Sequence, residues 1–461
     1  MMALMRNTRR DFIKAGAAAG CGLGLAGVAR SGFAGADRPN VLLILVDQDR
    51  GDLRLPVLKR PNLDRIRSSG LEFKSAYCAY PLCSPSRTTI MTGRYPHQAA
   101  VFANIDFIRK TQSLDPKIPN LGSVFSQAGY QTAYFGKWHL TRGAHNHQRM
   151  SRYGFYEMHV SNEAVAAGSD ARVLSDSAKW IRARKGNARP WMCIASPINP
   201  HDICFPALAA FYGKIPEYPV TLPQSFIDDP GEIYSEFGRY LTTSAIKTQR
   251  PKTPESWKRY LDFYCHLIEQ SDRGIGVLLD ALAESGQDEN TIVIYTSDHG
   301  EMGGAHGLVN KGMAMYEENL RVPLVIRHPE LRAPRTFSGP VSNADLAPTL
   351  CGLTGVNWPE PLPGFDLSPL CFGKEIARPN LIFAEGKTEY EGASPWRGIR
   401  TPDWKYWRYA DGFEFLVELQ NDPQEMTNLA RDNAFKEIKQ ELREKLRRFQ
   451  IDTNDPLLAK F

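Results

Sequence analysis

The chain has 461 residues, of which 42% are hydrophobic and 23% charged, a composition typical of a soluble globular enzyme. This length is enough to bury a substantial core and favours more than one structural unit. The formal net charge is +5, but residues 1–36 hold five Arg and Lys side chains and one acid, which leaves 51 basic and 50 acidic residues in the rest. A balance so close to neutral gives no support for nucleic-acid binding.

The first 36 residues are predicted to be an export signal. Thr8-Arg9-Arg10-Asp11-Phe12 is similar to a bacterial twin-arginine motif, and a mildly apolar run and the small residues Ala34-Gly35-Ala36 follow it. We therefore expect cleavage before Asp37 and a periplasmic or secreted protein that uses the twin-arginine export machinery. The apolar run is short and Gly-rich for a bilayer, so stable membrane insertion is not expected.

The body of the chain alternates short apolar runs with helical patterns, which predicts an α/β fold. We expect a large, mostly parallel sheet flanked by helices on both faces. The predicted strands are 40–46, 130–135, 191–195, 291–296 and 322–326. The predicted helices are 62–69, 121–128, 175–184 and 260–283.

The pattern changes after residue 375. Residues 404–409 and 413–419 are typical of an antiparallel hairpin, and residues 434–449 form an amphipathic helical pattern. We therefore expect a catalytic domain over 37–375 and a smaller C-terminal α/β subdomain with a short antiparallel sheet over 376–461.

The segment Cys83-Ser84-Pro85-Ser86-Arg87 has the properties of an anion-binding helix start. Ser84 is predicted to cap the helix, Pro85 suits its first turn, and Gly93 can end it. Cys83 then lies at the positive end of the helix, about one turn from Arg87, a setting that lowers the pKa of a thiol and attracts anions. Taken alone, the segment is also compatible with a buried structural cysteine or a cysteine-nucleophile hydrolase or phosphatase.

Polar side chains follow four of the predicted strands. These are Asp47-Gln48-Asp49, Lys137-Trp138-His139, Asn199-Pro200-His201-Asp202 and Asp298-His299. In an open α/β sheet, ligands bind outside the carboxyl ends of the strands. Together with Cys83 and Arg87, these residues predict a combined metal and anion site.

The Cys-x-Pro-x-Arg segment and its flanks, 79–82 and 88–94, resemble the signature of type I sulfatases, in the alkaline phosphatase superfamily. The resemblance covers nearly the whole mature chain. It implies that a formylglycine-generating enzyme oxidises Cys83 to formylglycine, whose hydrate is the nucleophile. The implied activity is hydrolysis of a sulfate monoester, with a sulfated carbohydrate as the expected substrate. A phosphomonoester or phosphonate monoester hydrolase and a catalytically silent glycan-binding relative are the alternatives.

The resemblance also implies one bound Ca²⁺ per chain. Its ligands would be Asp47, Gln48, Asp298 and His299, together with residue 83, and oxygen-rich ligands suit such a cation. Many members of the family have aspartate in place of Gln48 and asparagine in place of His299, so the ligand set here carries less negative charge than in those members. Asp49 could replace Gln48, but neighbouring strand residues normally point in opposite directions.

The remaining catalytic roles are carried over from the resemblance. Arg87 and Lys137 would hold the formylglycine hydrate and the sulfate, and Lys311 would contact sulfate near the leaving oxygen. His201 would be the general acid that protonates the departing alcohol. His139 would then accept the proton of the second hydroxyl when sulfate is released.

Two features of the sequence leave alternatives open. Six further cysteines of the mature chain are interpreted mainly as core residues, although a disulfide involving Cys193 or Cys204 remains an alternative. The six are Cys78, Cys193, Cys204, Cys265, Cys351 and Cys371.

Substrate specificity is expected to depend on loops within 141–160 and 203–258. Four basic side chains of the first loop would either bind a uronate or a second sulfate of the substrate, or lie in solvent. These are His145, His147, Arg149 and Arg152.

Overall fold

The computed structural model describes residues 38–51, 58–105, 112–143, 146–161, 165–227, 250–312, 314–386 and 394–461. The predicted export signal over 1–36 lies outside these residues, as do His145 and residues 228–249 of the second predicted specificity loop. Among the described residues, no helix has the length and apolar character needed to cross a bilayer.

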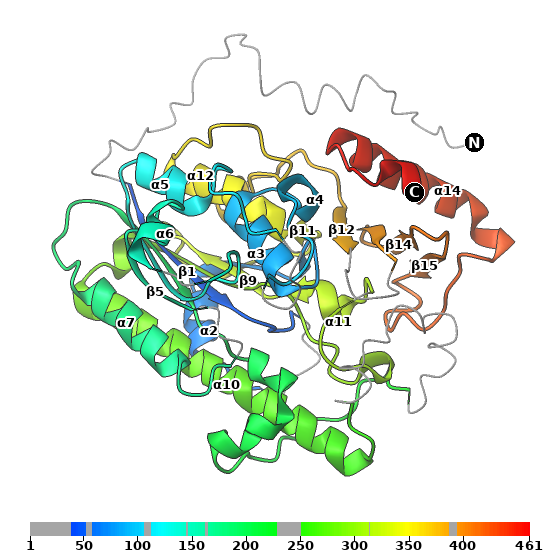
Figure 1. Ribbon diagram of the computed structural model, residues 1–461, viewed down its shortest axis with the longest axis horizontal. Helices are drawn as coiled ribbons and strands as arrows, with labels where there is room; N and C mark the ends of the chain where they lie inside the picture. The colour runs from blue at the N-terminus through cyan, green and yellow to red at the C-terminus, as the bar shows by residue number, and fades with distance from the viewer. Residues whose placement is uncertain are drawn as a thin grey trace, which may run out of the picture.

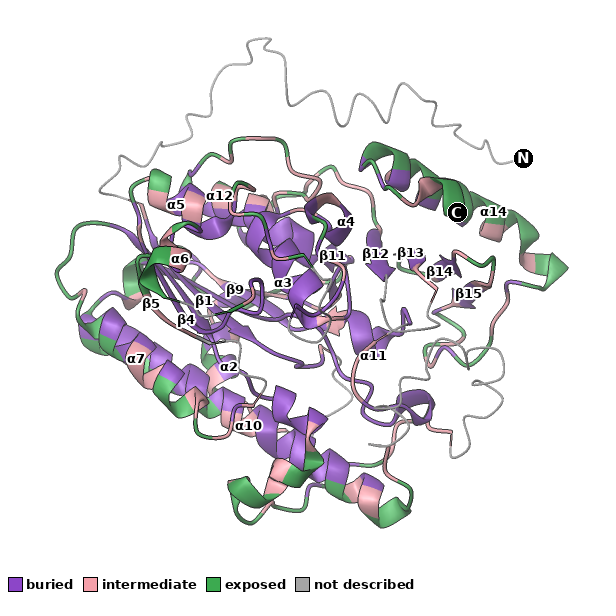
Figure 2. Cartoon of the chain, in the orientation of Figure 1, coloured by how far each residue is buried: buried purple, intermediate pink, exposed green. Residues whose placement is uncertain are grey.

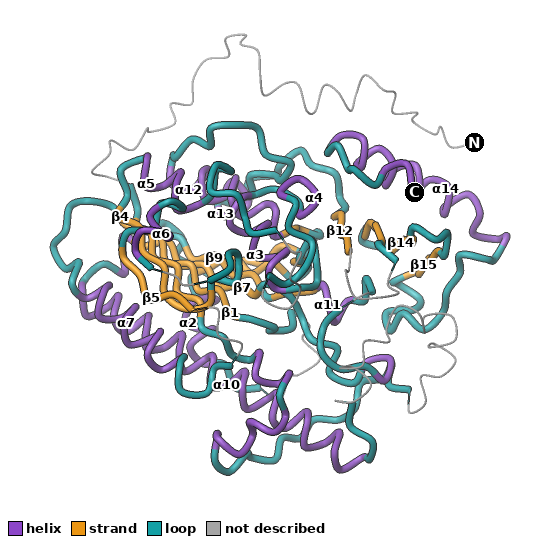
Figure 3. Tube along the Cα trace, viewed as in Figure 1, coloured by secondary structure: helices purple, strands orange, loops and turns teal. Residues whose placement is uncertain are grey.

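The central sheet has eight strands in the order β10-β2-β9-β7-β1-β6-β4-β5. β1 (Asn40–Val46) lies in its middle and pairs in parallel with β7 (Thr291–Ser297) on one side and β6 (Trp191–Ser196) on the other. β4 (Gln131–Lys137) and β5 (Glu157–Ser161) continue this parallel arrangement to one edge. Figure 3 shows these strands as a stack separate from the smaller C-terminal sheet.

The other half of the sheet is mixed. β9 (Leu324–Arg327) runs antiparallel to β7 and to β2 (Gly70–Phe73), which pairs in parallel with β10 (Arg335–Phe337). The prediction of one strand over 322–326 is wrong in detail, because Pro323 lacks the N–H that a continuous ladder needs. β8 (Arg321–Val322) instead joins a three-stranded sheet with β3 (Ala76–Tyr77) and β11 (Val341–Ser342).

Helices cover both faces of the central sheet (Figure 1). Leu42, Ile44 and Val46 pack in one cluster with residues of α2 (Pro61–Arg67), α7 (Asp170–Arg182) and α10 (Pro254–Ser285). The alternate residues Val41, Leu43 and Leu45 pack with α3 (Cys83–Thr92), α5 (Leu121–Gln127) and α12 (Leu346–Thr354). Burial on both faces explains why β1 is apolar from Val41 to Val46. The predicted α/β fold is confirmed.

Short helices complete the part of the chain that precedes the C-terminal sheet. They are α4 (Pro96–Ala99), α6 (His147–Ser151), α11 (Glu317–Leu320) and α13 (Ser368–Cys371), with 3₁₀ turns η1 (His201–Cys204), η2 (Pro206–Tyr212), η3 (Asp288–Asn290), η4 (Ala305–Gly307) and η5 (Asn343–Asp345). The seven described cysteines are all free, so no disulfide joins Cys193 or Cys204 to another of them.

The C-terminal part contains a separate antiparallel sheet, β12-β13-β14-β15. Its strands are β12 (Ile382–Gly386), β13 (Trp396–Arg400), β14 (Trp404–Tyr409) and β15 (Glu414–Glu418), followed by η6 (Asn433–Phe435), α14 (Lys436–Asp452) and η7 (Leu458–Lys460). The predicted hairpin and terminal helix are confirmed, and most of α14 is exposed in Figure 2.

Candidate active site

Charged side chains from the ends of three parallel strands meet in the buried interior. Asp47 follows β1, Lys137 ends β4 and Asp298 follows β7, and each is at most 1% exposed. Lys137 Nζ lies 2.8 Å from Asp47 Oδ2. Because adjacent parallel strands end at the same edge, the predicted clustering of these groups is confirmed.

Helix α3 brings Cys83 to this edge. The prediction that Ser84 caps the helix is wrong: Leu82 is the N-cap residue, with extended backbone, and its carbonyl accepts the Ser86 N–H at 3.0 Å. The Ser84 N–H is instead bonded at 3.0 Å to Asn104 Oδ1, so a residue distant in sequence supplies the cap. Gly93 ends the helix in the left-handed region with φ 66°, as predicted.

The Cys83 thiol lies among ionisable groups. Its Sγ is 3.2 Å from His299 Nε2, 3.8 Å from Asp47 Oδ1 and 3.9 Å from Lys137 Nζ. Burial and Asp47 raise the pKa of Cys83, but Lys137, Lys311 and His299 outweigh them and hold it well below the usual value. A buried residue 83 is thus surrounded by positive charge, which favours an anionic ligand.

Arg87 connects the carboxylates of the site. Its Nε donates to Asp298 Oδ2 at 2.8 Å and its Nη2 to Asp47 Oδ2 at 3.1 Å. Its Nη1 donates at 2.8 Å to both the Lys137 carbonyl and Ser196 Oγ. These contacts of Arg87 hold the protein framework of the site.

Four side chains form a group that could hold a metal ion: Asp47, Cys83, Asp298 and His299. One candidate ligand atom from each lies within 4.8 Å of the others. Burial and the neighbouring Asp47 carboxylate raise the pKa of Asp298 to about 7. Two buried carboxylates this close repel each other, and a divalent cation between them would relieve that repulsion. The donor set therefore fits a metal ion.

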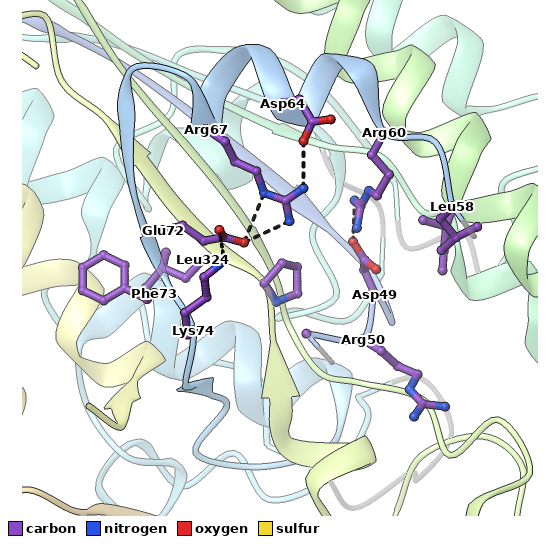
Figure 4. A pocket seen from close by; sticks show the side chains of 13 residues that line it. Asp49, Arg50, Leu58, Arg60, Asp64, Arg67, Glu72, Phe73, Lys74 and Leu324 are labelled. Atoms are coloured by element: carbon purple, nitrogen blue, oxygen red, sulfur yellow. Dashed lines mark hydrogen bonds and ion pairs between the residues drawn. The ribbon is translucent and has the colours of Figure 1, made fainter. Parts of the chain in front are cut away.

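Gln48 lies beside this group, in the left-handed region with φ 75°. Its amide oxygen accepts hydrogen bonds from Lys311 Nζ and from Cys204 Sγ, the latter at 3.1 Å, and its amide nitrogen donates to Glu301. Asp49 points away, as predicted, and pairs with Arg60 at 2.7 Å in a separate charged pocket (Figure 4).

Two histidines complete the site. His139, with φ 54°, follows β4, and His201 opens the 3₁₀ turn η1 after β6. Both form hydrogen bonds with the Cys83 side chain. Burial, then Lys137 and Lys311, lower the pKa of His201 to about 4. Burial also lowers the pKa of His139, so both imidazoles are neutral before an anion binds.

The sequence interpretation missed several residues that support the site. Asn104 caps α3, Ser196 bonds Arg87, and Cys204 and Glu301 contact Gln48. Glu301 comes two residues after His299, which is the one sequence signal that could have indicated it. Among the predicted specificity residues, Arg149 donates to the Arg142 carbonyl within its own loop.

The chain matches two family models. The model described as sulfatase covers residues 39–356, and the model for the C-terminal part of N-sulphoglucosamine sulphohydrolase covers residues 304–452. The first match alone extends over more than half of the chain. It contains all the residues of the site described above.

Curated relatives carry sulfatase names. The chain is 29% identical over 448 residues to the Δ4,5-hexuronate-2-O-sulfatase of Bacteroides thetaiotaomicron. This match covers 90% of this chain and 89% of the relative. The chain is 27% identical over 454 residues to the ulvan-active sulfatase of Formosa agariphila, covering 92% of this chain and 83% of the relative.

Solved structures are similar over the same length. A 2-O GAG sulfatase superposes with a TM-score of 0.76 and 27% identity, covering 92% of this chain and 94% of that chain. The phosphonate monoester hydrolase of Agrobacterium radiobacter has a TM-score of 0.73 with 23% identity, covering 90% and 96%, and shares the fold. The chain belongs to the sulfatase family and is a sulfuric ester hydrolase.

Proposed function

We propose that the chain hydrolyses a sulfate monoester of a carbohydrate, with formylglycine formed from Cys83 as the nucleophile. The observation that carries the proposal is the position of Cys83, at the start of α3 and beside three groups that lower its pKa: Lys137, Lys311 and His299. The names of the curated relatives favour sulfated uronides as the first substrates to test.

We further propose that Asp47, Asp298, His299 and residue 83 hold one divalent cation, with Ca²⁺ as the expected ion. Their convergence within 4.8 Å and the raised pKa of Asp298 support this proposal. When bound, the ion would polarise groups at residue 83 and withdraw charge from the sulfuryl oxygens. Gln48 remains a candidate fifth ligand.

The side chains around residue 83 have separate tasks in this proposal. A hydrated formylglycine offers one hydroxyl to the sulfuryl group and a second whose deprotonation releases sulfate. Lys137 and Lys311 stabilise the sulfuryl oxygens, and Arg87 keeps Asp47 and Asp298 in place.

The two histidines move protons. His201 is neutral in the free enzyme, since burial and two lysines lower its pKa to about 4. The negative charge of the bound ester would raise that pKa, so that the imidazole takes up a proton and delivers it to the departing alcohol. His139, also neutral, accepts the proton of the second hydroxyl.

The organisation of the chain is part of the proposal. Residues 1–36 would direct twin-arginine export to the periplasm or outside the cell, and a formylglycine-generating enzyme would act on Cys83 before export. The catalytic domain would span 37–375 and the C-terminal subdomain 376–461. The twin-arginine motif at Arg9 and Arg10 supports the export step.

Sulfate release is the decisive measurement. The protein, co-produced with a formylglycine-generating enzyme, should release sulfate from 2-O-sulfated uronides or ulvan oligosaccharides faster than phosphate from aryl phosphate or alcohol from a phosphonate monoester. Peptide mass spectrometry should show formylglycine at position 83, and Cys83→Ala should abolish turnover. Dominant phosphate or phosphonate hydrolysis, or full activity with an unmodified thiol, would reject the proposal. Glycan binding without turnover would instead indicate a silent relative.

A further inference from the structure

Glu301 is a buried carboxylate next to the site to which the proposed function assigns no task. It is 0% exposed and lies in the loop between Asp298 and Lys311. One oxygen, Oε1, accepts three hydrogen bonds: from Tyr260 Oη at 2.7 Å, from the Gly303 N–H at 3.0 Å and from the Asn310 N–H at 2.8 Å. The carboxylate therefore ties α10 and both ends of the segment 303–310 together, immediately before Lys311.

The other oxygen of Glu301 contacts Gln48. Glu301 Oε2 accepts the hydrogen bond of the Gln48 amide nitrogen, and the Gln48 amide oxygen accepts that of Lys311 Nζ. An ionised carboxylate only accepts hydrogen bonds, whereas an amide has one donor end and one acceptor end. Glu301 therefore determines which end of the Gln48 amide faces Lys311.

The opposite orientation of the amide would be unfavourable at both ends. A rotated Gln48 would turn its oxygen toward the Glu301 carboxylate and its NH₂ group toward the Lys311 ammonium. Buried polar groups left without a partner typically cost about 1–3 kcal/mol, and more where a charge is involved. The hydrogen bonds that link Glu301, Gln48 and Lys311 thus form a polar network. All of its donors and acceptors are paired in only one orientation of the Gln48 amide.

We propose that Glu301 is a positioning residue for Lys311. It acts through the Gln48 amide and through the backbone of 303–310, and it keeps the ammonium in place beside residue 83. The inference rests on the proposed function only in that Lys311 contacts the sulfate there.

A reciprocal exchange of the two side chains tests the proposal. In Glu301→Gln, the amide oxygen would keep the bonds from Tyr260, Gly303 and Asn310, but its NH₂ group would meet the NH₂ group of Gln48. We expect kcat/KM to fall roughly 10²-fold, the loss typical of a misplaced catalytic group. Adding Gln48→Glu restores a donor–acceptor pair and again presents an oxygen to Lys311, so the double variant should regain most of that loss.

Two further variants separate positioning from general destabilisation. In a Lys311→Met background, Glu301→Gln should reduce kcat/KM by less than about threefold, because effects of groups that act as a unit are not additive. Asp272→Asn is the matched control: this buried carboxylate accepts the Asn62 and Leu63 N–H groups at 3.1 and 2.8 Å, away from the site. It should lower the urea midpoint and leave kcat/KM unchanged.

Urea midpoints of the wild type, Glu301→Gln, Gln48→Glu and the double variant give a readout that does not depend on turnover. Each single exchange at 48 or 301 should lower the midpoint, and the double exchange should restore it. Absence of this coupling, failure of the double variant to recover activity, or a full additive loss in the Lys311→Met background would overturn the inference. If the wild type hydrolyses no sulfate ester, the proposed function fails, while the midpoints still decide whether Glu301 and Gln48 act as a pair.

Discussion

Replacing Arg87 by leucine should destabilise the protein strongly, because its guanidinium is bonded to two buried carboxylates. Arg87 is 1% exposed, and Asp47 and Asp298 are both 0% exposed. Breaking a buried ion pair by removing one partner costs about 3–5 kcal/mol, since the remaining charge loses its compensation. Leucine fills part of the space but donates no hydrogen bond to the two carboxylates, to Ser196 or to the Lys137 carbonyl.

The pH dependence of this cost follows from Asp298. Its pKa is raised to about 7 by burial and Asp47, even with Arg87 present. A carboxyl group whose folded-state pKa exceeds its unfolded value stabilises the fold at low pH, and this contribution is lost as pH rises through the folded pKa. Without Arg87 the pKa rises further, so the variant should be closest to the wild type near pH 6 and furthest from it near pH 8.

Urea unfolding of both proteins in a chelator, at pH 6 and pH 8, measures this difference. We expect about 3 kcal/mol or more at pH 8, near the lower limit for a buried pair because Asp298 can take up a proton. Arg448→Leu is the control, since it breaks an exposed helical pair with Asp452 and should cost under about 1 kcal/mol. A loss at Arg87 no greater than that of the control, or one that shrinks with rising pH, would refute the electrostatic account.

Two other predictions concern histidines. His201→Ala should slow esters of poor leaving groups by about 10²–10⁴, and nitrophenyl sulfate much less, because only a poor leaving group needs the proton; equal losses in steady-state assays would reject His201 as the acid. His97 Nδ1 lies 3.1 Å from Glu385 and its Nε2 lies 3.3 Å from the Thr453 carbonyl. Burial lowers the pKa of His97, but Glu385 raises it more, so the net shift is upward. Its stabilisation is therefore complete below about pH 6.5 and lost at higher pH. Urea unfolding of the wild type and His97→Gln should converge toward pH 9; a constant difference would contradict this.

Apolar patterning predicted the elements whose burial is regular. β1 was predicted with its observed bounds, because both of its faces are buried and its residues after Asn40 are all apolar. The start of α10 was predicted six residues too late, since its first two turns are polar. There the helix is defined by Thr253, whose side chain accepts the Ser256 N–H at 3.2 Å, rather than by an apolar stripe.

The parts of the site that sequence could not predict depend on contacts between distant segments. Asn104 caps α3 from a residue that carries no local signal. The four acceptors of Arg87 lie in β4 and β6 and directly after β1 and β7, so its framework role appears only once these strands are assembled in the sheet. Family resemblance supplies the identities of the polar residues, whereas the direction in which each side chain points is a property of the packed sheet.

The charge balance around residue 83 explains how an amide is accommodated at position 48. Arg87, Lys137 and Lys311 bring three positive charges to the site, and Asp47, Asp298 and Glu301 bring three carboxyl groups. A carboxylate at 48 would add a fourth acidic group and would face the buried Glu301 carboxylate, which bonds the Gln48 amide nitrogen. The amide avoids both effects, because it keeps an oxygen toward Lys311 without adding charge. A site that must attract an anion and stabilise charge on its oxygens would be weakened by a further negative charge.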